Sequence, residues 1–343
     1  MKVFYRIIAF FLSLFTLLGG LPALFSAPAM PEQTAVVKSD ALNRKLYDDF
    51  YAGAQAFAVI PGLKEKMIPQ GIAYAAAQDA FLVTGYYENG ALPSVLCVLD
   101  GKTGALRKTL LLADAAGEPQ TGHFGGIAAW EGFVYASAGK KLYVYEAQAV
   151  RSCGNGAALR AAAVYALPDA GSFCTAGNGL LLTGTFISAE DAKNADGVTV
   201  NGEKLCAAAH VYRLDAEKTL GLASVTKNKL VPAGEVYIPQ EVQGAALTAD
   251  GSLWLSASFG RRSDSRIYRF RDFDPAVLTE TGTAETALTA KRAAETLTAP
   301  PMAEGMTACP QGAAVIFESG AVGYRLLMGH CPVDRVLILP AER

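Results

Sequence analysis

The chain lacks an excess of charge of either sign, since 30 Lys and Arg residues stand against 32 Asp and Glu residues. A formal net charge of -2 does not provide the basic surface with which proteins hold the phosphates of nucleic acids. We therefore expect no nucleic-acid partner. Charged residues are also few, at 18%, while hydrophobic residues make up 51%. This balance argues against global disorder and provides enough apolar material for a continuous core.

Several motifs of known chemistry are absent as well. The six cysteines contain no C-x-x-C pair, which argues against a zinc ribbon or a thioredoxin-like redox site. There is no H-E-x-x-H, no G-x-S-x-G, and no G-x-G-x-x-G after a strand-like run. An even number of cysteines in an exported chain permits disulfides but does not fix their pairing. Cys97 lies inside the apolar run 95–99 and is predicted to be a small core residue.

The N-terminus has the pattern of a secretory signal. Lys2 and Arg6 precede an uncharged apolar run over residues 7–25, and small residues follow at positions 26, 27 and 29. The run is also long enough to span a bilayer if it is not cleaved. We expect residues 1–29 to be a signal peptide or a membrane anchor, and residues 7–25 to be the only contact with a membrane. Either alternative makes the folded part extracytoplasmic, secreted or anchored at the outer face of the cytoplasmic membrane.

The rest of the chain is a succession of short apolar strands separated by turn signals. The clearest unit has four such runs, at 70–74, 80–86, 94–100 and 105–111, with an Asp-Gly hairpin signal at 100–101. Similar units begin near Gly126, Ser172, Gly244 and Gly305. The starting points are roughly 45 to 70 residues apart, whereas a four-stranded blade needs about 40–50 residues. We interpret the units as blades with insertions.

This repeat predicts an all-β fold, a β-propeller of four-stranded blades over residues 54–343, with residues 30–53 as a linker. Five blades are recognised, and a sixth would have to lie within an insertion. Because residues 54–60 form an orphan strand and the fifth unit lacks its fourth strand, we expect the N-terminal strand to close the ring. Residues 189–204 are predicted to be a polar insertion, and residues 274–299 a short helix or a surface loop. A β-sandwich is the rival interpretation.

In a propeller, the segments that lead into the innermost strands converge on one face, which is the default position of a site. We predict seven ligand-binding residues from these segments and from the loops between second and third strands: Gln70, Tyr86, His123, Gln243, Arg261, Glu304 and Glu318. Two nearby carboxylates can hold a divalent cation such as calcium, or keep a proton between them. Glu304 and Glu318 are therefore the candidate metal ligands. Together with His123, they are also the candidate catalytic residues.

Each of these residues also has a structural interpretation. The two glutamines can hydrogen-bond to the backbone of neighbouring blades, and His123 can make a structural hydrogen bond within its glycine-rich segment. The glutamates can cap free backbone N–H groups, and Arg261 can form an ion pair between blades. His210 and His330 are predicted to be structural or exposed.

Four segments carry a family resemblance. They are residues 68–74, residues 121–128, Gln243-Gly244 together with residues 256–261, and residues 301–305 together with 317–319. Over roughly residues 55 to 340, the chain resembles an uncharacterised group of exported bacterial β-propeller proteins, and it is more distantly similar to gluconolactonase-like and quinoprotein-like propellers. The gluconolactonase-like enzymes hold a pore metal with Glu, Asn and Asp. Here only the two glutamates match, and no Asp or Asn before an inner strand completes the set.

These observations predict an exported cell-envelope propeller that recognises a small polar ligand, a glycan or an envelope protein on its pore face without catalysis. The alternative is a hydrolase, assisted by a divalent metal, that uses the pore glutamates to cleave a lactone or a phosphoester. A purely structural scaffold is a third interpretation. No particular substrate is indicated.

Overall fold

The computed structural model describes residues 30–37, 44–90, 92–271, 273–274, 283, 286–325 and 331–341. The chain divides into two compact units, Met1–Met30 and Pro31–Arg343. The predicted signal peptide or anchor at residues 1–29 lies outside the described residues. In the part of the chain that is described, no helix has both the length and the apolar composition that a membrane span needs. The described strands all belong to the second unit.

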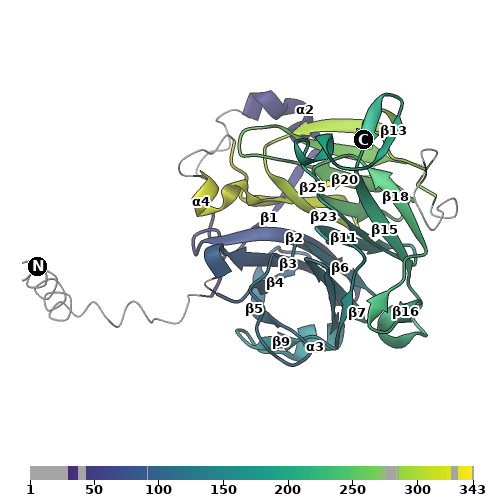
Figure 1. The fold of residues 1–343 in the computed structure, drawn as a ribbon. Helices are drawn as coiled ribbons and strands as arrows, with labels where there is room; N and C mark the ends of the chain where they lie inside the picture. The colour runs from purple at the N-terminus through teal and green to yellow at the C-terminus, as the bar shows by residue number, and fades with distance from the viewer. Residues whose placement is uncertain are drawn as a thin grey trace, which may run out of the picture. The chain divides into compact units, whose positions relative to one another are not determined.

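Five sheets form the blades of this unit (Figure 1). The first consists of β2 (Met67–Ala75), β3 (Ala80–Tyr87), β4 (Val95–Asp100), β5 (Leu106–Ala113) and β9 (Ala158–Arg160). The second consists of β6 (Gly126–Trp130), β7 (Phe133–Ala138), β8 (Lys141–Glu146), β10 (Ala163–Ala166), β17 (Lys229–Leu230) and β16 (Val225–Thr226). In both sheets the four strands from the pore outward are antiparallel neighbours, and β9 or β17 then joins the fourth strand in parallel.

The other three blades have four strands each. The third consists of β11 (Phe173–Gly177), β12 (Leu180–Gly184), β15 (Ala207–Arg213) and β18 (Gly234–Ile238). The fourth consists of β19 (Val242–Leu247), β20 (Leu253–Ala257), β21 (Ser265–Phe270) and β22 (Glu295–Ala299). The fifth consists of β23 (Ala303–Cys309), β24 (Gly312–Phe317), β25 (Arg335–Pro340) and β1 (Gln55–Val59).

The blades form a closed ring. The inner strand β2 packs beside β6 and β23, while β11 packs beside β6 and β19, and β19 packs beside β23. Figure 1 shows β2, β6, β11 and β23 running through the middle of the unit. The N-terminal strand β1 pairs with β25 in antiparallel fashion, with Gln55 opposite Ile338, and so supplies the fourth strand of the last blade. The predictions of a five-bladed propeller and of closure by the N-terminal strand are confirmed.

Glycine recurs near the start of the inner strands because neighbouring strands approach too closely there for a side chain. A Cβ atom at Gly126 would lie 2.2 Å from the backbone nitrogen of Cys174, and one at Gly244 would lie 2.4 Å from the backbone oxygen of Glu304. Short hydroxyl side chains fill the gap beside such glycines. The Thr84 hydroxyl accepts from its own blade and donates to the Phe124 carbonyl of the next blade at 2.8 Å. The recurrent glycine is therefore explained by the close packing between neighbouring blades.

Residues ahead of β1 hold the closure in place. Asp334 in the last blade is buried, and its carboxylate accepts hydrogen bonds from the backbone N–H groups of Val36 and Val37 at 2.7 and 2.9 Å. The Gln33 side chain donates to the carbonyl of Val59 and accepts from the N–H of Leu106 in the first blade, both at 2.8 Å. Residues 33–37 therefore connect the two blades that meet at the closure.

Part of the segment predicted to be a linker is helical and packed. It contains a 3-10 turn at Arg44–Tyr47 and helix α2 at Asp48–Gly53. Phe50 is fully buried, with its ring edge-to-face against Phe317 at 6.2 Å, and the Tyr47 hydroxyl donates to Asp264 at 2.9 Å. The segment contributes to the apolar core, because the side chain of Phe50 is removed entirely from water.

The insertions differ partly from expectation. Residues 198–205 form a hairpin of β13 (Val198–Val200) and β14 (Glu203–Leu205), turned by Asn201 and Gly202 at positive φ, which is typical of a two-residue turn. The region 274–299, predicted to be a helix or a loop, ends in β22 and contains a 3-10 turn at Ala290–Arg292. The other helices are α3 (Ala147–Ser152) and α4 (Val322–Arg325). Cys97 is fully buried as predicted, and within the described residues no disulfide forms.

Candidate functional site

Three inner strands carry a register irregularity at the same place. The pairing shifts between Pro69 and Ile72 in β2, between Val242 and Gly244 in β19, and between Ala303 and Met306 in β23. A β-bulge re-aims the side chain at the irregularity. In each strand the residue that precedes the glycine is polar: Gln70, Gln243 and Glu304. All three line one cavity.

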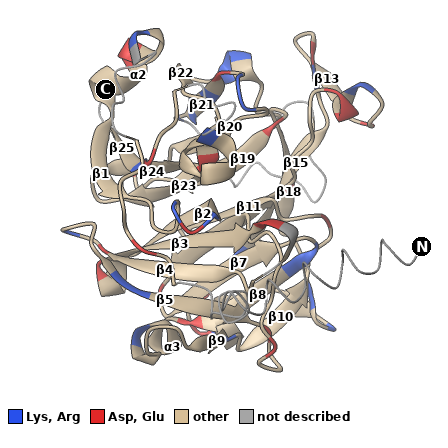
Figure 2. Ribbon diagram, turned by 90° about the vertical axis from the view of Figure 1, so that its left-hand side faces the viewer, with Lys and Arg blue, Asp and Glu red and all other residues tan. Residues whose placement is uncertain are grey.

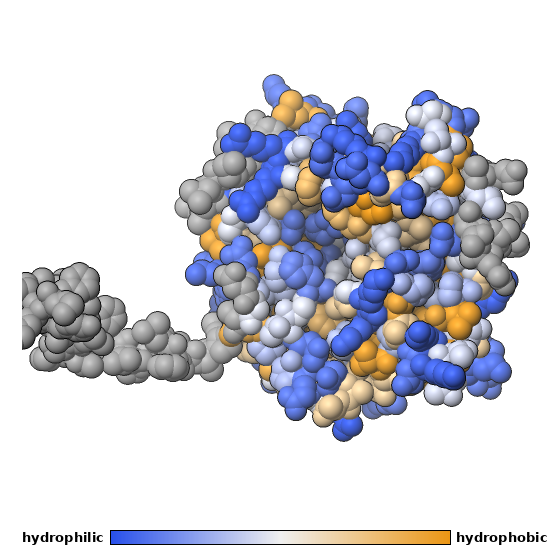
Figure 3. Space-filling model, viewed as in Figure 1, coloured by the Kyte–Doolittle hydropathy of each residue, from blue (hydrophilic) through white to orange (hydrophobic). Residues whose placement is uncertain are grey.

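This cavity of about 370 Å³ receives residues from every blade. Its described lining consists of Gln70, Tyr86, His123, Gly125, Gly139, Ala170, Gly171, Ser172, Phe186, Gln243, Glu304, Glu318 and Tyr324. The face drawn in Figure 3 is hollowed near its middle, with hydrophilic side chains around the hollow. Each blade contributes one residue from an equivalent position at its inner strand. In blade order these residues are Gln70, Gly125, Ser172, Gln243 and Glu304. The repeat itself therefore builds the site.

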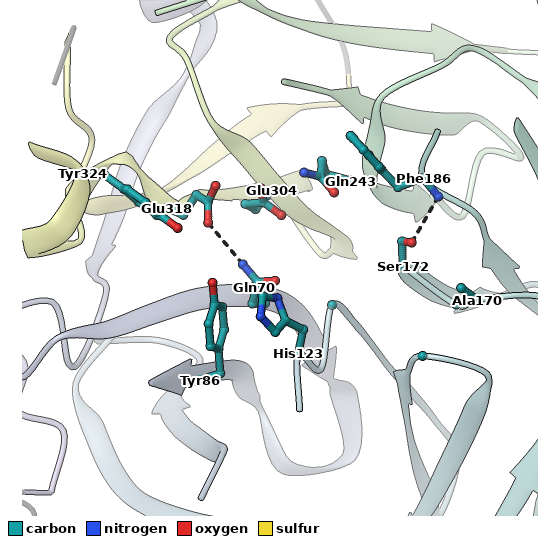
Figure 4. Close-up of a pocket in the computed structure, with 13 residues that line it drawn as sticks. Gln70, Tyr86, His123, Ala170, Ser172, Phe186, Gln243, Glu304, Glu318 and Tyr324 are labelled. Atoms are coloured by element: carbon teal, nitrogen blue, oxygen red, sulfur yellow. Dashed lines mark hydrogen bonds between the residues drawn. The ribbon is translucent and has the colours of Figure 1, made fainter. Parts of the chain in front are cut away.

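Two carboxyl groups lie side by side in this cavity (Figure 4). Glu304 comes from β23 and is only 4% exposed, and Glu318 follows β24 in a 3-10 turn. The Gln70 side-chain amide donates to Glu318 Oε2 at 3.3 Å. Burial, together with the charge of Glu318, raises the pKa of Glu304 well above its usual range. Burial also raises the pKa of Glu318 to about 7, although a hydrogen bond with Glu304 and the charge of Arg261 act in the opposite direction.

One wall of the cavity is aromatic. The rings of Tyr86 and His123 are stacked, with their centroids 3.7 Å apart, and the Tyr86 and Tyr324 hydroxyls share a hydrogen bond. Burial raises the pKa of both tyrosines. His123 is exposed at the mouth, and the partial loss of water around its ring lowers its pKa, which favours neutral imidazole near pH 7. The Arg261 guanidinium lies over the Tyr324 ring, 4.6 Å from the centroid.

The opposite wall combines a hydroxyl with two phenylalanines. Ser172 Oγ accepts a hydrogen bond from the Phe186 backbone N–H at 3.1 Å, which fixes the loop that follows β12 (Figure 4). The Phe186 ring lines the cavity, and its centroid lies 5.8 Å from that of Phe259, which is 52% exposed. The cavity therefore has carboxyl, amide and hydroxyl groups between aromatic walls.

The structure brings together six of the seven predicted ligand-binding residues: Gln70, Tyr86, His123, Gln243, Glu304 and Glu318. Arg261 does not belong to the lining but contacts Tyr324, which does. His210 is buried elsewhere, with its ring nitrogens 3.2 Å from Asp169 and 3.3 Å from Glu235. His330 lies outside the described residues.

Among the lining residues that sequence reasoning missed, Phe186, Ser172 and Tyr324 have polar or aromatic side chains. Phe186 lies after the second strand of the third blade, a position equivalent to that of Tyr86, so the same rule applied to the irregular third unit finds it. Ser172 marks the start of that unit and lies directly before its inner strand β11, whereas Gln70 in the first unit lies within β2. Tyr324 is in the short helix α4, and no sequence pattern predicts that this helix lies beside the cavity.

Beside the predicted metal ligands Glu304 and Glu318, the oxygen donors of the cavity are the uncharged amides of Gln70 and Gln243 and the hydroxyls of Tyr86, Tyr324 and Ser172. Among the described residues, no group of three or more His, Cys, Asp and Glu side chains is arranged to hold a metal ion. The third candidate, His123, is stacked on Tyr86. The donor set therefore fits a carboxyl pair that keeps a proton better than it fits a metal centre.

Replacing Glu304 with glutamine is expected to stabilise the protein more at pH 8 than at pH 5. An unfolded glutamate loses its proton near pH 4.3, at about its unperturbed pKa, whereas the pKa of Glu318 in the folded pair is about 7 and that of Glu304 is also raised. Between these pH values the folded state binds more protons than the unfolded state, so the pair's contribution to stability falls as the pH rises. Replacing one carboxyl group with an amide removes this loss of stability at high pH. The gain in Tm, measured by calorimetry, should be at least about 2 °C larger at pH 8.

The exposed Glu217 provides the matched control for this measurement. Glu217→Gln removes the same charge at a solvated position, so it should shift Tm by the same small amount at both pH values. An equal gain from Glu304→Gln at pH 5 and pH 8 would contradict the raised pKa values of the pair.

Comparison with known proteins concerns the fold. No protein-family model matches the chain, and no curated protein sequence matches it. Among solved structures, glutaminyl cyclase from Myxococcus xanthus is similar with a TM-score of 0.45 and 12% identity, over 84% of this chain and 96% of that one. The putative oxidoreductase (glucose dehydrogenase) from Thermus thermophilus has a TM-score of 0.41 and 13% identity, over 83% and 98%. Aldose sugar dehydrogenase from Streptomyces coelicolor, in its PQQ-bound form, has a TM-score of 0.39 and 15% identity, over 77% and 78%.

At such identities and TM-scores, these similarities assign neither an activity nor a ligand to this chain.

Proposed function

We propose that the protein is an exported cell-envelope propeller that binds a small polar ligand in its pore-face cavity without catalysis. The observation that carries the proposal is the convergence of all five blades on one cavity of about 370 Å³. That volume is within the range of small-molecule sites, which are commonly about 300–1,000 Å³. A glycan or an envelope protein would have to place a terminal group of this size in the cavity.

The side chains in the cavity support recognition of a polar molecule. Gln70 and Gln243 offer amide donors and acceptors, Glu304 and Glu318 offer carboxyl oxygens, and Tyr86 offers a flat ring. Polar groups held on rigid strands fix the orientation of a ligand, while aromatic walls provide the contact area. Charged residues elsewhere on the unit are of both signs, and neither sign is concentrated on one side (Figure 2). This distribution favours a small ligand over a polyanion.

An extracytoplasmic location is part of the proposal. It rests on the basic start, the apolar run over residues 7–25 and the small residues that follow. Expression of the full chain with a C-terminal reporter that is active only outside the cytoplasm tests this part independently of ligand binding.

Screening the purified full-length protein against a library of sugars, polyols, amino compounds and organic acids should identify a ligand. Saturation-transfer NMR detects binding, and calorimetry then gives Kd. Gln243→Ala should weaken the binding of that ligand about tenfold, because the hydrogen bond from a half-buried amide in the cavity is lost. Gln148→Ala removes an exposed amide on α3, away from the cavity, and should leave Kd unchanged.

Two results would contradict this proposal. One is that Gln148→Ala weakens binding as much as Gln243→Ala, since the ligand would then bind elsewhere. The other is a stoichiometric divalent metal in the purified protein that is lost in both Glu304→Gln and Glu318→Gln. That second result would support the alternative function, a metal-assisted hydrolase, and would call for lactone and phosphoester assays.

A further inference from the structure

We propose that the part of the ligand that reaches Glu304 and Glu318 is a protonated amine, an inference that rests on the proposed function of the same cavity. The charge of the lining leads to this proposal. Glu304 and Glu318 are the acidic residues in the described lining, and no Lys or Arg belongs to it. Arg261 acts on Glu318 from outside the lining, but burial still leaves the pKa of Glu318 raised. A buried carboxylate is costly when its charge is only partly compensated, and a cationic ligand group inside the cavity would complete the compensation.

The surrounding donors do not replace such a partner. Gln70 donates to Glu318 through an uncharged amide at 3.3 Å, and Gln243 lies beside Glu304 in the same cavity (Figure 4). Hydrogen bonds from neutral donors are weaker than those from an ammonium, which has three donors on one compact charge. The carboxyl pair and the glutamine side-chain oxygens can accept all three. A hydroxyl of equal size would donate once and would leave the charge uncompensated.

The aromatic walls favour a cation for an independent reason. Tyr86, Phe186 and Tyr324 present rings to the cavity, and a ring face attracts a cation within about 6 Å of its centroid. The guanidinium of the exposed Arg261 already lies over the Tyr324 ring in this way, 4.6 Å from the ring centroid. Carboxyl groups between aromatic walls are a combination that can hold an ammonium group.

The remaining titratable groups near the pair leave its acidic character in place. His123, at the mouth, has a pKa lowered by partial burial, which favours the uncharged imidazole. The phenols of Tyr86 and Tyr324 have raised pKa values and remain neutral. From outside the lining, Glu88 acts on Tyr86, while Arg261 acts on both Tyr324 and Glu318. The charge of Arg261 lowers the pKa of Glu318, but burial outweighs it and the pKa remains raised to about 7. Burial favours a proton on the carboxyl pair in the absence of ligand, and an ammonium supplies the same positive charge.

Matched pairs of amines and alcohols test this inference directly. The probes are glucosamine with glucose, glycinamide with glycolamide, and cyclohexylamine with cyclohexanol, each titrated into the full-length protein at pH 7. In the pairs that bind, the amine should bind at least about tenfold more tightly than its alcohol. Glu304→Gln should reduce this preference to less than about twofold, because it removes a charge and keeps the shape.

Glu217→Gln is the control for Glu304→Gln, since it removes the same charge from an exposed position and should keep the preference. Circular dichroism establishes that both variants are folded. Equal binding of amine and alcohol, or binding of no amine, would overturn the inference. The proposed function would still stand if a neutral library compound binds and Gln243→Ala weakens it. If no compound of the library or of the matched pairs binds in the cavity, both the proposed function and this inference would be wrong.

Discussion

Replacing Arg269 with methionine is expected to lower the free energy of unfolding by about 2–3 kcal/mol. Arg269 on β21 is only 3% exposed, and its Nη2 atom lies 2.8 Å from Asp250 Oδ2. Its guanidinium also lies over the buried Trp254 ring, 4.8 Å from the centroid. Methionine keeps much of the aliphatic volume but leaves Asp250 without its cation and Trp254 without the cation–π contact.

The expected loss is smaller than the roughly 3–5 kcal/mol found when a fully buried pair is broken. The reason is that the Asp250 side chain is 44% exposed, so water can solvate part of its charge. Hydrogen bonds from Thr248 and Ser252 also remain. With the arginine they hold the pKa of Asp250 below its usual range, although partial burial raises it.

Arg107→Met is the matched control, measured by urea unfolding at pH 7 and followed by circular dichroism. Arg107 forms a pair with Asp100 at 2.7 Å, but its side chain is 40% exposed. An exposed pair contributes about 1 kcal/mol or less. If Arg269→Met lowered the free energy of unfolding no more than Arg107→Met does, burial and the Trp254 contact would add nothing to the stability that the Arg269–Asp250 pair contributes.

The fold was predictable from the sequence where strands are buried on both faces. Residues of β3 and β4 form continuous apolar runs, and almost all of them are buried. The outer strands are different. The segment Glu295–Ala299 alternates between exposed and buried residues and follows a long insertion, so its pattern was not recognised as the fourth strand of its blade. The outer strands Ala163–Ala166 and Gly234–Ile238 were missed as well, and both contain partly buried residues instead of a continuous buried run.

The candidate site was predictable to the extent that it repeats. Gln70, Gln243 and Glu304 occupy the same position in three blades, so the ring geometry predicts that they meet. Tyr324 comes from a connection that has no equivalent in the other blades, and only the folded chain places it beside Tyr86. Side-chain contacts such as the carboxyl pair depend on the bulges, and a bulge leaves no mark in the sequence beyond a glycine.

The glycine that recurs at the inner strands of four of the five blades leads to the other prediction of large effect. Gly126→Ala is expected to lower the free energy of unfolding by about 3 kcal/mol. The added Cβ would lie 2.2 Å from the backbone nitrogen of Cys174 and 2.3 Å from Ser137 Oγ. The first of these atoms belongs to the inner strand of the next blade. Because a backbone atom cannot rotate away as a side chain can, the two blades have to separate.

Gly132→Ala provides the comparison, because a Cβ atom there meets no atom within 4 Å. Gly132 is exposed, in the turn between β6 and β7, and an alanine at such a position changes stability by about 0.5 kcal/mol or less. Urea unfolding of both variants separates close approach from the general effect of alanine on the unfolded chain, which both share. If Gly126→Ala lost no more stability than Gly132→Ala, close approach between the blades would not explain the recurrent glycine. The ring would then tolerate wider spacing of its blades around the cavity.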